Sequence, residues 1–313
     1  MCRRIVITTD YLGPGDSIDH LLREHGLDPV YSPAAGPRTK AEQRQLLAGA
    51  VGAIVSSEPI TRNMLTEAAD LRSVARSGVG YDSVDTSAAR ELGIRVANTP
   101  GVNHHAVAEL TLALMLSCAK HLSDVINGVN AGQWPRTAGT ELRGKTLGVI
   151  VYGPSGKATA QISAALGMNV IVGTSHPDTE AGRTIEFADL DDVVRSADFL
   201  TLHARATGTP IIDAERLAAM KETAFLIDTA RGSLVDEAAL VTALEQRQIA
   251  GAALDVLETE PMQADSPPRN FDNVWITSHL AGQTVEARER AGLAAAQAVI
   301  DELEGRQPVG LIV

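Results

Sequence analysis

The segment from residue 144 to residue 176, GKTLGVIVYGPSGKATAQISAALGMNVIVGTSH, constrains the fold of this chain more than any other. Residues 147–152 form an almost wholly apolar run, residues 153–156 have the composition of a turn, and residues 157–166 have the pattern of a helix. A second apolar run follows at residues 170–172. Strand, glycine turn, helix and strand within about thirty residues match one right-handed βαβ unit. The segment therefore predicts a parallel sheet.

The glycine turn in this unit is a candidate dinucleotide site. A turn that leads into a helix N-terminus presents backbone N–H groups and the positive end of the helix dipole, which suits a pyrophosphate. Of the G-x-G-x-x-G fingerprint, Gly153 and Gly156 are present, but Val151 replaces the first glycine. The acidic residue expected after the second strand is missing, because Thr174 follows Gly173. The motif alone leaves open both a bound dinucleotide and a plain βαβ unit with a tight turn.

Composition and charge favour small-molecule chemistry. The 313 residues, 44% hydrophobic and 21% charged, suffice for two domains. The net charge of −12 argues against nucleic acid or an anionic membrane as a partner, and 3% aromatics argue against base stacking. The two cysteines, Cys2 and Cys118, build no disulfide framework. Because no apolar run has the length of a signal-peptide core or a membrane span, we expect a cytoplasmic protein.

Short apolar runs alternate with helical stretches along the chain. This alternation is typical of parallel sheets with crossover helices, so we expect an α/β fold with two doubly wound domains. Residues 1–98 are predicted to form the first domain and residues 99–285 the second. The alanine-rich tail, residues 286–313, is expected to return to the first domain. The main apolar runs are at residues 5–7, 53–55, 73–75, 95–97, 199–202, 224–227, 251–256 and 274–277.

Residues 102–127 are predicted to form one long helix. Its apolar residues cover much of the circumference, as in a helix buried between domains or against another subunit. Three histidines, His104, His105 and His121, lie in this segment, but none has a carboxylate at ligand spacing. We therefore expect no metal site.

The glycine loop Ser77-Gly78-Val79-Gly80 follows directly after a predicted strand. Loops outside the carboxyl ends of parallel strands are where α/β sheets bind ligands, and the bare N–H groups of such a loop can hold a carboxylate. On this loop alone, an ordinary strand-to-helix turn is the preferred interpretation.

Three polar residues, Arg231, Glu260 and His279, stand at or just beyond the carboxyl ends of predicted strands. Arg supplies a planar double donor for a carboxylate, and His exchanges a proton near neutral pH. Glu can orient that His and favour its charged form. Each residue alone is best read as a surface residue in a loop, but together they form a chemically complete set for an active site.

The chain resembles the D-isomer-specific 2-hydroxyacid dehydrogenases, which include phosphoglycerate dehydrogenase and glyoxylate or hydroxypyruvate reductases. The resemblance rests on RSGVGYDSVD, VANTPGVNHHAVAELTLALML, the βαβ unit, LHARATGTPIIDAERLAAMK, LIDTARGSLVDEAAL, GAALDVLETEP and ITSHLAG, in the family's order. It implies a Rossmann-like dinucleotide domain inserted into a flavodoxin-like substrate domain, with the active site in the cleft between them.

The resemblance also implies residue roles. By its place in the motif, Arg231 is similar to the arginine that holds the substrate carboxylate, His279 to the acid/base and Glu260 to its partner. In reduction, hydride reaches the C2 carbonyl while protonated His279 protonates the oxygen. Residues 77–80 resemble the family's carboxylate-binding backbone. The cofactor, NAD or NADP, would contact Gly153, Pro154, Ser155, Gly156, Thr174, Ser175, His176, His203, Thr229, Ala230, Asp255, His279 and Gly282.

Several residues depart from the family pattern. Thr174 or Ser175 stands where NAD-preferring members carry Asp, which removes the repulsion against a 2′-phosphate and leaves the choice of cofactor open. Asp228 replaces the usual Asn, and Ser56 replaces the phosphate-binding Arg common in phosphoglycerate dehydrogenases. Phosphoglycerate is therefore a disfavoured substrate.

Two hypotheses follow. The first is an NAD(P)-dependent enzyme that interconverts a small 2-oxo acid and its 2-hydroxy acid, which the intact Arg231, Glu260 and His279 favour. The second is a non-catalytic protein of the same fold that senses a nucleotide, which the altered glycine loop allows. The resemblance further implies a homodimer, formed through the helix from Val102 and the arm through Trp134; the alternative is that this helix spans the two domains of one subunit.

Overall fold

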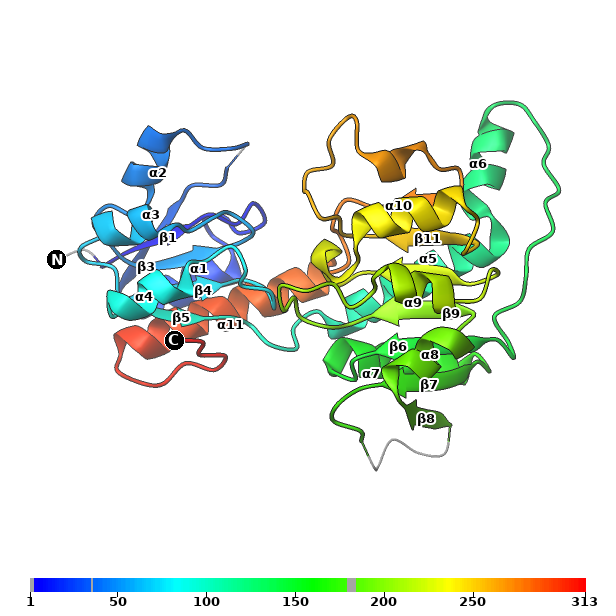
Figure 1. Cartoon of the computed structure of the whole chain (residues 1–313). Helices are drawn as coiled ribbons and strands as arrows, with labels where there is room; N and C mark the ends of the chain where they lie inside the picture. Colours follow the sequence, from blue (N-terminus) through cyan, green and yellow to red (C-terminus); the bar gives the residue numbers. More distant parts are fainter. Residues whose placement is uncertain (1–2, 35, 179–183) are drawn as a thin grey trace. The chain divides into compact units, whose positions relative to one another are not determined.

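The computed structural model describes residues 3–34, 36–178 and 184–313, in which the chain forms two compact units (Figure 1). The first unit comprises Met1–Asn103 with Gln283–Val313, and the second comprises His104–Gly282. Each is built on its own parallel sheet, so the predicted fold class, two parallel-sheet α/β domains, is confirmed. The assignment of substrate binding to residues 1–98 with 286–313, and of dinucleotide binding to residues 99–285, stays a prediction.

The first unit has a five-stranded sheet of order β2-β1-β3-β4-β5, the flavodoxin-like order. The inner strand β1 buries Ile5, Val6 and Ile7 completely, as expected for a strand covered by helices on both faces. The elements are β1 (Arg3–Ile7), α1 (Ser17–Glu24), β2 (Leu27–Tyr31), α2 (Lys40–Leu46), β3 (Ala50–Val55), α3 (Arg62–Glu67), β4 (Ser73–Arg76), α4 (Thr86–Glu91), β5 (Arg95–Ala97) and, from the end of the chain, α11 (Val285–Leu303).

Helix α11 packs on the sheet of the first unit. It begins after Thr284, whose side chain caps it by accepting the N–H of Ala287 at 3.2 Å. Its small apolar face, with Ala295 and Val299 fully buried, joins the core cluster of β1. A Cβ atom at Gly52 of β3 would lie 2.9 Å from Val299 Cγ1, so glycine permits this close approach of helix and strand.

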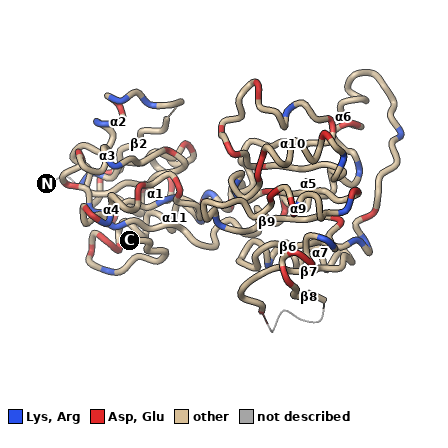
Figure 2. Tube along the Cα trace, viewed as in Figure 1, with Lys and Arg blue, Asp and Glu red and all other residues tan. Residues whose placement is uncertain are grey.

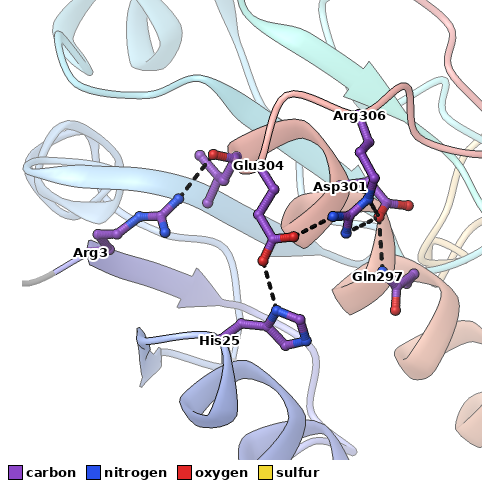
Figure 3. A network of polar contacts seen from close by, with 7 residues as sticks. Arg3, His25, Gln297, Asp301, Glu304 and Arg306 are labelled. Carbon is purple, nitrogen blue, oxygen red and sulfur yellow. Dashed lines mark hydrogen bonds and ion pairs between the residues drawn. The ribbon is translucent and has the colours of Figure 1, made fainter.

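A polar network ties the end of α11 to the start of the chain (Figure 3). Glu304 Oε1 lies 2.7 Å from His25 Nδ1, Arg306 Nε donates to Asp301 at 2.9 Å, and Arg3 donates to the last carbonyl of α11 at 3.2 Å. Figure 2 shows acidic and basic residues interspersed along both units, this segment included. Since exposed ion pairs contribute only about 0–1 kcal/mol each, the apolar face of α11 supplies most of its attachment.

The second unit has a seven-stranded parallel sheet of order β12-β11-β10-β9-β6-β7-β8. Its elements are α5 (His104–Lys120), α6 (Leu122–Asn130), β6 (Thr146–Ile150), α7 (Pro154–Ala165), β7 (Asn169–Gly173), β8 (Ile185–Ala188), α8 (Leu190–Ser196), β9 (Phe199–Leu202), α9 (Ala214–Ala219), β10 (Phe225–Asp228), the 3-10 turn η1 (Gly232–Leu234), α10 (Glu237–Glu245), β11 (Gly251–Leu254), η2 (Pro267–Asn270) and β12 (Val274–Ile276).

Two apolar clusters cover the two faces of this sheet. On one face, Met115 of α5 and Ala160 of α7 pack with Val149 and other strand residues. On the other face, helices α8, α9 and α10 pack on residues such as Leu200 and Leu226. Successive strand residues point to opposite faces, so near-continuous apolar strands are needed to fill both layers.

The predicted single helix over residues 102–127 is wrong. The structure has two helices, α5 and α6, which are bent by 68° at His121, a residue in the left-handed conformation with φ of 52°. Periodicity extends across His121 and gives no sign of this break, because the break is in the backbone and not in the hydrophobic pattern. Within the described residues no single helix is long and apolar enough to span a membrane; only this bent pair meets the length and composition required.

Cys118 lies fully buried in α5, and burial raises the pKa of its thiol to about 12. The thiol is therefore an apolar packing group rather than a nucleophile. Cys2 lies outside the described residues.

Candidate active site

The predicted site residues of the second unit follow the carboxyl ends of its strands. Strand β6 has β7 on one side and β9 on the other, so the strand order reverses there, and ligands of doubly wound sheets bind at such a point. The predicted residues lie after β6 (153–156), after β7 (174–176), after β9 (His203), after β10 (229–231), after β11 (Asp255 and Glu260) and after β12 (His279 and Gly282).

The glycine turn after β6 fits a dinucleotide phosphate. Gly153 is the N-cap of α7 and has open space where a Cβ would be, whereas a Cβ at Gly156 would lie 2.2 Å from the carbonyl oxygen of Val151. Gly156 therefore allows helix and strand to pack closely, and Gly153 leaves one side of the turn open to a ligand. The first-turn N–H groups have no intrahelical acceptor, and Pro154 at the start of the helix removes one of them.

Val151, which replaces the first glycine of the fingerprint, has φ of 72°. This left-handed conformation is one that glycine adopts without cost and a β-branched residue adopts only under strain, of about 1–2 kcal/mol. The Val151 N–H donates to Gly173 at 2.8 Å, and its side chain packs against the apolar cluster of α8, α9 and α10. The left-handed backbone of Val151 is thus supported by its hydrogen bond to β7 and by the packing of its side chain.

His203 forms the β9 side of this turn. Its Nδ1 lies 3.2 Å from the hydroxyl of Ser155, and its Nε2 lies 3.3 Å from the hydroxyl of Thr201. Burial lowers the pKa of His203 to about 4, so the ring is neutral at neutral pH. Two predicted cofactor residues, Ser155 and His203, are therefore brought together by hydrogen bonding.

Beyond β7, hydroxyl and imidazole groups lie close together, and Thr174 stands where the dinucleotide fingerprint has an acidic residue. Ser175 Oγ lies 2.9 Å from His176 Nδ1, and the His176 N–H donates to Thr174 Oγ1 at 3.2 Å. The nearest acid along the chain is Asp178, which accepts from Lys157 of α7 at 2.8 Å. An ion pair thus links the helix after the glycine turn to the loop after β7.

Arg231 closes the turn that follows β10. Its Nη1 donates to the carbonyl of Ala230 at 2.6 Å, and Thr229 lies 3.0 Å, hydroxyl to hydroxyl, from Thr111 of α5. A Cβ at Gly232 would lie 1.9 Å from the carbonyl carbon of Leu257, so glycine permits the turn to pack on the segment that leads to Glu260. Thr111 is a contact that sequence reasoning missed, because nothing in α5 marks it as different from its neighbours.

Glu260 and His279 form a hydrogen-bonded pair. Glu260 Oε2 lies 2.7 Å from His279 Nδ1, and its Oε1 accepts the N–H of Leu257 at 3.0 Å. Burial raises the pKa of Glu260, but the hydrogen bonds from His279 and Leu257 and the charges of His279 and Arg231 outweigh it, so the pKa lies below its usual value. The carboxylate is therefore ionised at neutral pH, with the imidazole held against it.

Asp255 organises the loop that carries His279. Its carboxylate accepts from the hydroxyl of Thr277 at 2.5 Å and from the N–H groups of Leu280 and Ala281 at 2.9 and 2.8 Å. The His279 N–H donates to the Asp255 carbonyl at 2.8 Å, and His279 itself has φ of 56°. Side-chain and backbone bonds together thus fix the otherwise unfavourable backbone of the predicted acid/base.

The predicted carboxylate loop, residues 77–80, lies in the first unit after β4. The Gly78 N–H donates to Thr99 Oγ1 at 2.8 Å, and Ser77 Oγ lies 2.7 Å from the hydroxyl of Tyr11. The guanidinium of Arg288 lies 5.0 Å from the centre of the Tyr11 ring. Sequence reasoning missed Tyr11, although its position just after a predicted strand could have drawn attention to it.

Among the residues that the structure describes, no group of three or more His, Cys, Asp or Glu side chains could hold a metal ion. The chemistry available at the edge of the second sheet is instead that of an ionised Glu with a His, an Arg and a glycine turn.

Known proteins match this chain over most of its length. Residues 112–281 match the family described as D-isomer specific 2-hydroxyacid dehydrogenase, NAD binding domain. A glyoxylate reductase of Aeropyrum pernix is 38% identical over 82% of this chain and 80% of its own. The chain belongs to the D-isomer-specific 2-hydroxyacid dehydrogenases. A hydroxypyruvate reductase of Thermotoga maritima is 36% identical over 79% of this chain and 83% of its own.

The solved structure of the TT0316 protein from Thermus thermophilus has a TM-score of 0.90 to this dehydrogenase and 35% identity, covering 99% of this chain and 100% of that one. A D-3-phosphoglycerate dehydrogenase of Methanocaldococcus jannaschii is 38% identical over 80% of this chain, but the match covers only 49% of that protein.

The family membership confirms the enzyme hypothesis over the nucleotide-sensing one. The dehydrogenase is an NAD(P)-dependent oxidoreductase that transfers hydride between a nicotinamide cofactor and a small 2-hydroxy or 2-oxo acid. The roles of the individual site residues stay predictions.

The strain at Val151 predicts that glycine is more stabilising than alanine at this position, the reverse of the usual order within a strand. We expect V151G to be more stable than V151A by about 1 kcal/mol, because glycine relieves the left-handed conformation that alanine retains. Urea unfolding of both variants measures the difference. The same pair at Val149, which lies buried within β6, is the control, and there alanine should be the more stable. Greater stability of V151A would show that residue 151 is not left-handed in solution.

Proposed function

We propose that this dehydrogenase reduces small, unphosphorylated 2-oxo acids such as glyoxylate or hydroxypyruvate, with His279 as the proton donor. The observation that carries the proposal is the 2.7 Å hydrogen bond between His279 Nδ1 and the ionised Glu260. Two relatives named glyoxylate reductase and hydroxypyruvate reductase support this substrate class. When bound, the nicotinamide supplies the hydride.

The residues of this chain then have the following roles. Because Nδ1 of His279 is bonded to Glu260, the opposite ring nitrogen, Nε2, is the one that protonates the substrate oxygen. Glu260 stabilises the imidazolium by its opposite charge, and Arg231 binds the substrate carboxylate. In the first unit, the loop at residues 77–80 is proposed to bind a carboxylate through the N–H groups of Val79 and Gly80, because those of Ser77 and Gly78 already donate to Val55 and Thr99.

An unphosphorylated substrate is supported by the end of β3. Ser56 and Glu58 stand there, and Glu58 is ion-paired with Arg38, with both side chains only 13% exposed. A bound phosphate would need the positive charge of Arg38. The carboxylate of Glu58 already neutralises that charge.

The acid/base role predicts distinct effects of two substitutions. Reduction requires protonated His279, so H279A should lower kcat/KM by about 10²–10⁴-fold. E260Q removes the charge that faces His279 Nδ1, so kcat/KM should also fall, but by less than in H279A. Oxidation of reduced cofactor with glyoxylate measures both, and E258Q, at an exposed neighbour, is the control. Full activity in H279A would exclude the proposed role.

NADPH is proposed as the preferred cofactor. Thr174, Ser175 and His176 offer hydrogen-bonding groups after β7, and none of these side chains is a carboxylate that would repel a 2′-phosphate. Lys157, at the start of α7, places a cation at the same edge, although it is shared with Asp178.

A new acid after β7 should reverse the choice of cofactor. T174D places a carboxylate where the 2′-phosphate would lie, and we expect the ratio of NADPH to NADH affinity to fall at least about tenfold. Titration of nicotinamide fluorescence measures both affinities. T140D, an exposed threonine elsewhere in the unit, controls for the change in net charge. Tighter binding of NADH than NADPH by the unchanged protein would refute the proposal.

A homodimer is proposed to form through α6. This helix has no buried residue, and Leu122, Ile126 and Val129 on one face are 40%, 55% and 43% exposed. Trp134, in the segment that follows, is 80% exposed. An apolar surface of this kind is typical of a protein interface, and a second copy of this chain is its proposed occupant.

Polar substitutions on α6 should separate the subunits. The double variant I126S/V129S removes two apolar anchors and should raise the dimer dissociation constant by about 100-fold or more, at about 1.5–3 kcal/mol per buried side chain. Sedimentation velocity over a range of concentrations measures it. L92S, at a residue 44% exposed in the first unit, is the control. A monomeric unchanged protein would overturn the proposal.

A further inference from the structure

The carboxyl group of Asp228 is buried at the end of β10 and is not used by the roles assigned above. The residue is 0% exposed, and its Oδ1 accepts the N–H of Ala230 at 2.8 Å. Its Oδ2 has no hydrogen-bond partner among residues 3–34, 36–178 and 184–313. A buried carboxylate with an unsatisfied oxygen is costly, so its protonated form is favoured.

The charged surroundings of Asp228 are few. Arg231 lies in the turn that follows β10, the strand of Asp228. Asp255 lies just after β11, and its N–H donates to the Asp228 carbonyl at 2.8 Å. The strands on either side place Leu202 and Leu254 opposite Asp228. His203, just after β9, is neutral because burial lowers its pKa to about 4.

These surroundings set the protonation of Asp228. Burial raises the pKa of this carboxyl to about 7; the N–H groups of Ala230 and Arg231 and the Arg231 charge oppose the rise, and the charge of Asp255 adds to it. Asp228 therefore changes charge near neutral pH, three residues before the residue proposed to bind the substrate carboxylate.

We propose that Asp228 is a positioning residue that couples uptake of a proton to binding of the substrate carboxylate at Arg231. Its Oδ1 bond to Ala230 shapes the turn in either protonation state, so the geometry is kept while the charge changes. The ionised form adds a negative charge beside Arg231, which opposes a second carboxylate there. By linkage, binding of the substrate carboxylate raises the proton affinity of Asp228. The inference rests on the proposed role of Arg231.

Binding of oxamate, a non-reducible analogue of a 2-oxo acid, tests the coupling. The cofactor is kept saturating. Between about pH 6 and about pH 8.5 the dissociation constant of oxamate should rise in the unchanged protein, and this rise should be about fivefold larger than the rise in D228N. Asn keeps the acceptor for the Ala230 N–H and cannot ionise in this range. D192N, at an exposed residue of α8, should behave as the unchanged protein. Titration calorimetry measures all three, and equal pH dependence in D228N and the unchanged protein overturns the proposal.

Enzyme kinetics separate positioning from a purely structural role. In glyoxylate reduction the added pH dependence should appear in KM and be absent from kcat, because Asp228 acts through carboxylate binding and not on proton transfer from His279. A D228N defect that is the same at every pH would assign the residue a structural role and overturn the coupling.

Stability against pH gives a readout independent of activity. A group whose pKa is raised in the folded state stabilises the fold at low pH, and this contribution is lost as pH rises from about 4 to about 7. The Tm of the unchanged protein should therefore fall relative to that of D228N across this window. A constant Tm difference overturns the inference, whereas absence of glyoxylate turnover with the expected Tm and oxamate results would refute only the proposed substrate.

Discussion

The carboxylate of Asp255 joins the strand ends on which the candidate active site depends. It is 1% exposed and accepts hydrogen bonds from Thr277, Leu280 and Ala281, while its backbone bonds to Asp228 and to His279. Three donors replace the water that a buried carboxylate loses. Because the same residue binds the ends of β10 and the loop after β12, the positions of Arg231 and His279 are set relative to one framework of hydrogen bonds.

Hydrophobic patterning predicts most of this fold. Parallel strands covered on both faces must be apolar throughout, so the runs in the sequence reveal the two sheets. The pattern does not reveal the break at His121, because a single left-handed residue leaves the apolar periodicity on either side intact. The pattern does not reveal the edge strand β8 either; only Ile185 of its four residues is buried, so it lacks the apolar run that marks a central strand.

The sequence predicts the site residues that lie at the carboxyl edge of one parallel sheet. Carboxyl ends of parallel strands meet at the same edge, so a Glu and a His placed after neighbouring strands can be expected to approach, and Glu260 and His279 lie at hydrogen-bond distance. Contacts that depend on strand order are different. Tyr11 meets Ser77 because β1, β3 and β4 are neighbours in the sheet, and this order cannot be read from local composition. The left-handed backbone of Val151 likewise depends on its bond to Gly173.

Asp228 and Asp255 are two buried carboxyl groups with different hydrogen-bonding surroundings. Both side chains are almost completely excluded from water, at 0% and 1% exposure, at the ends of adjacent strands. The side chain of Asp255 accepts three hydrogen bonds, one from a hydroxyl and two from backbone N–H groups. Within the described part of the chain, one oxygen of the Asp228 side chain accepts none. The number of donors aimed at each carboxyl is therefore the difference between them. At Asp228 the missing donors leave the cost of burial uncompensated, and the pKa of its carboxyl is raised to about 7.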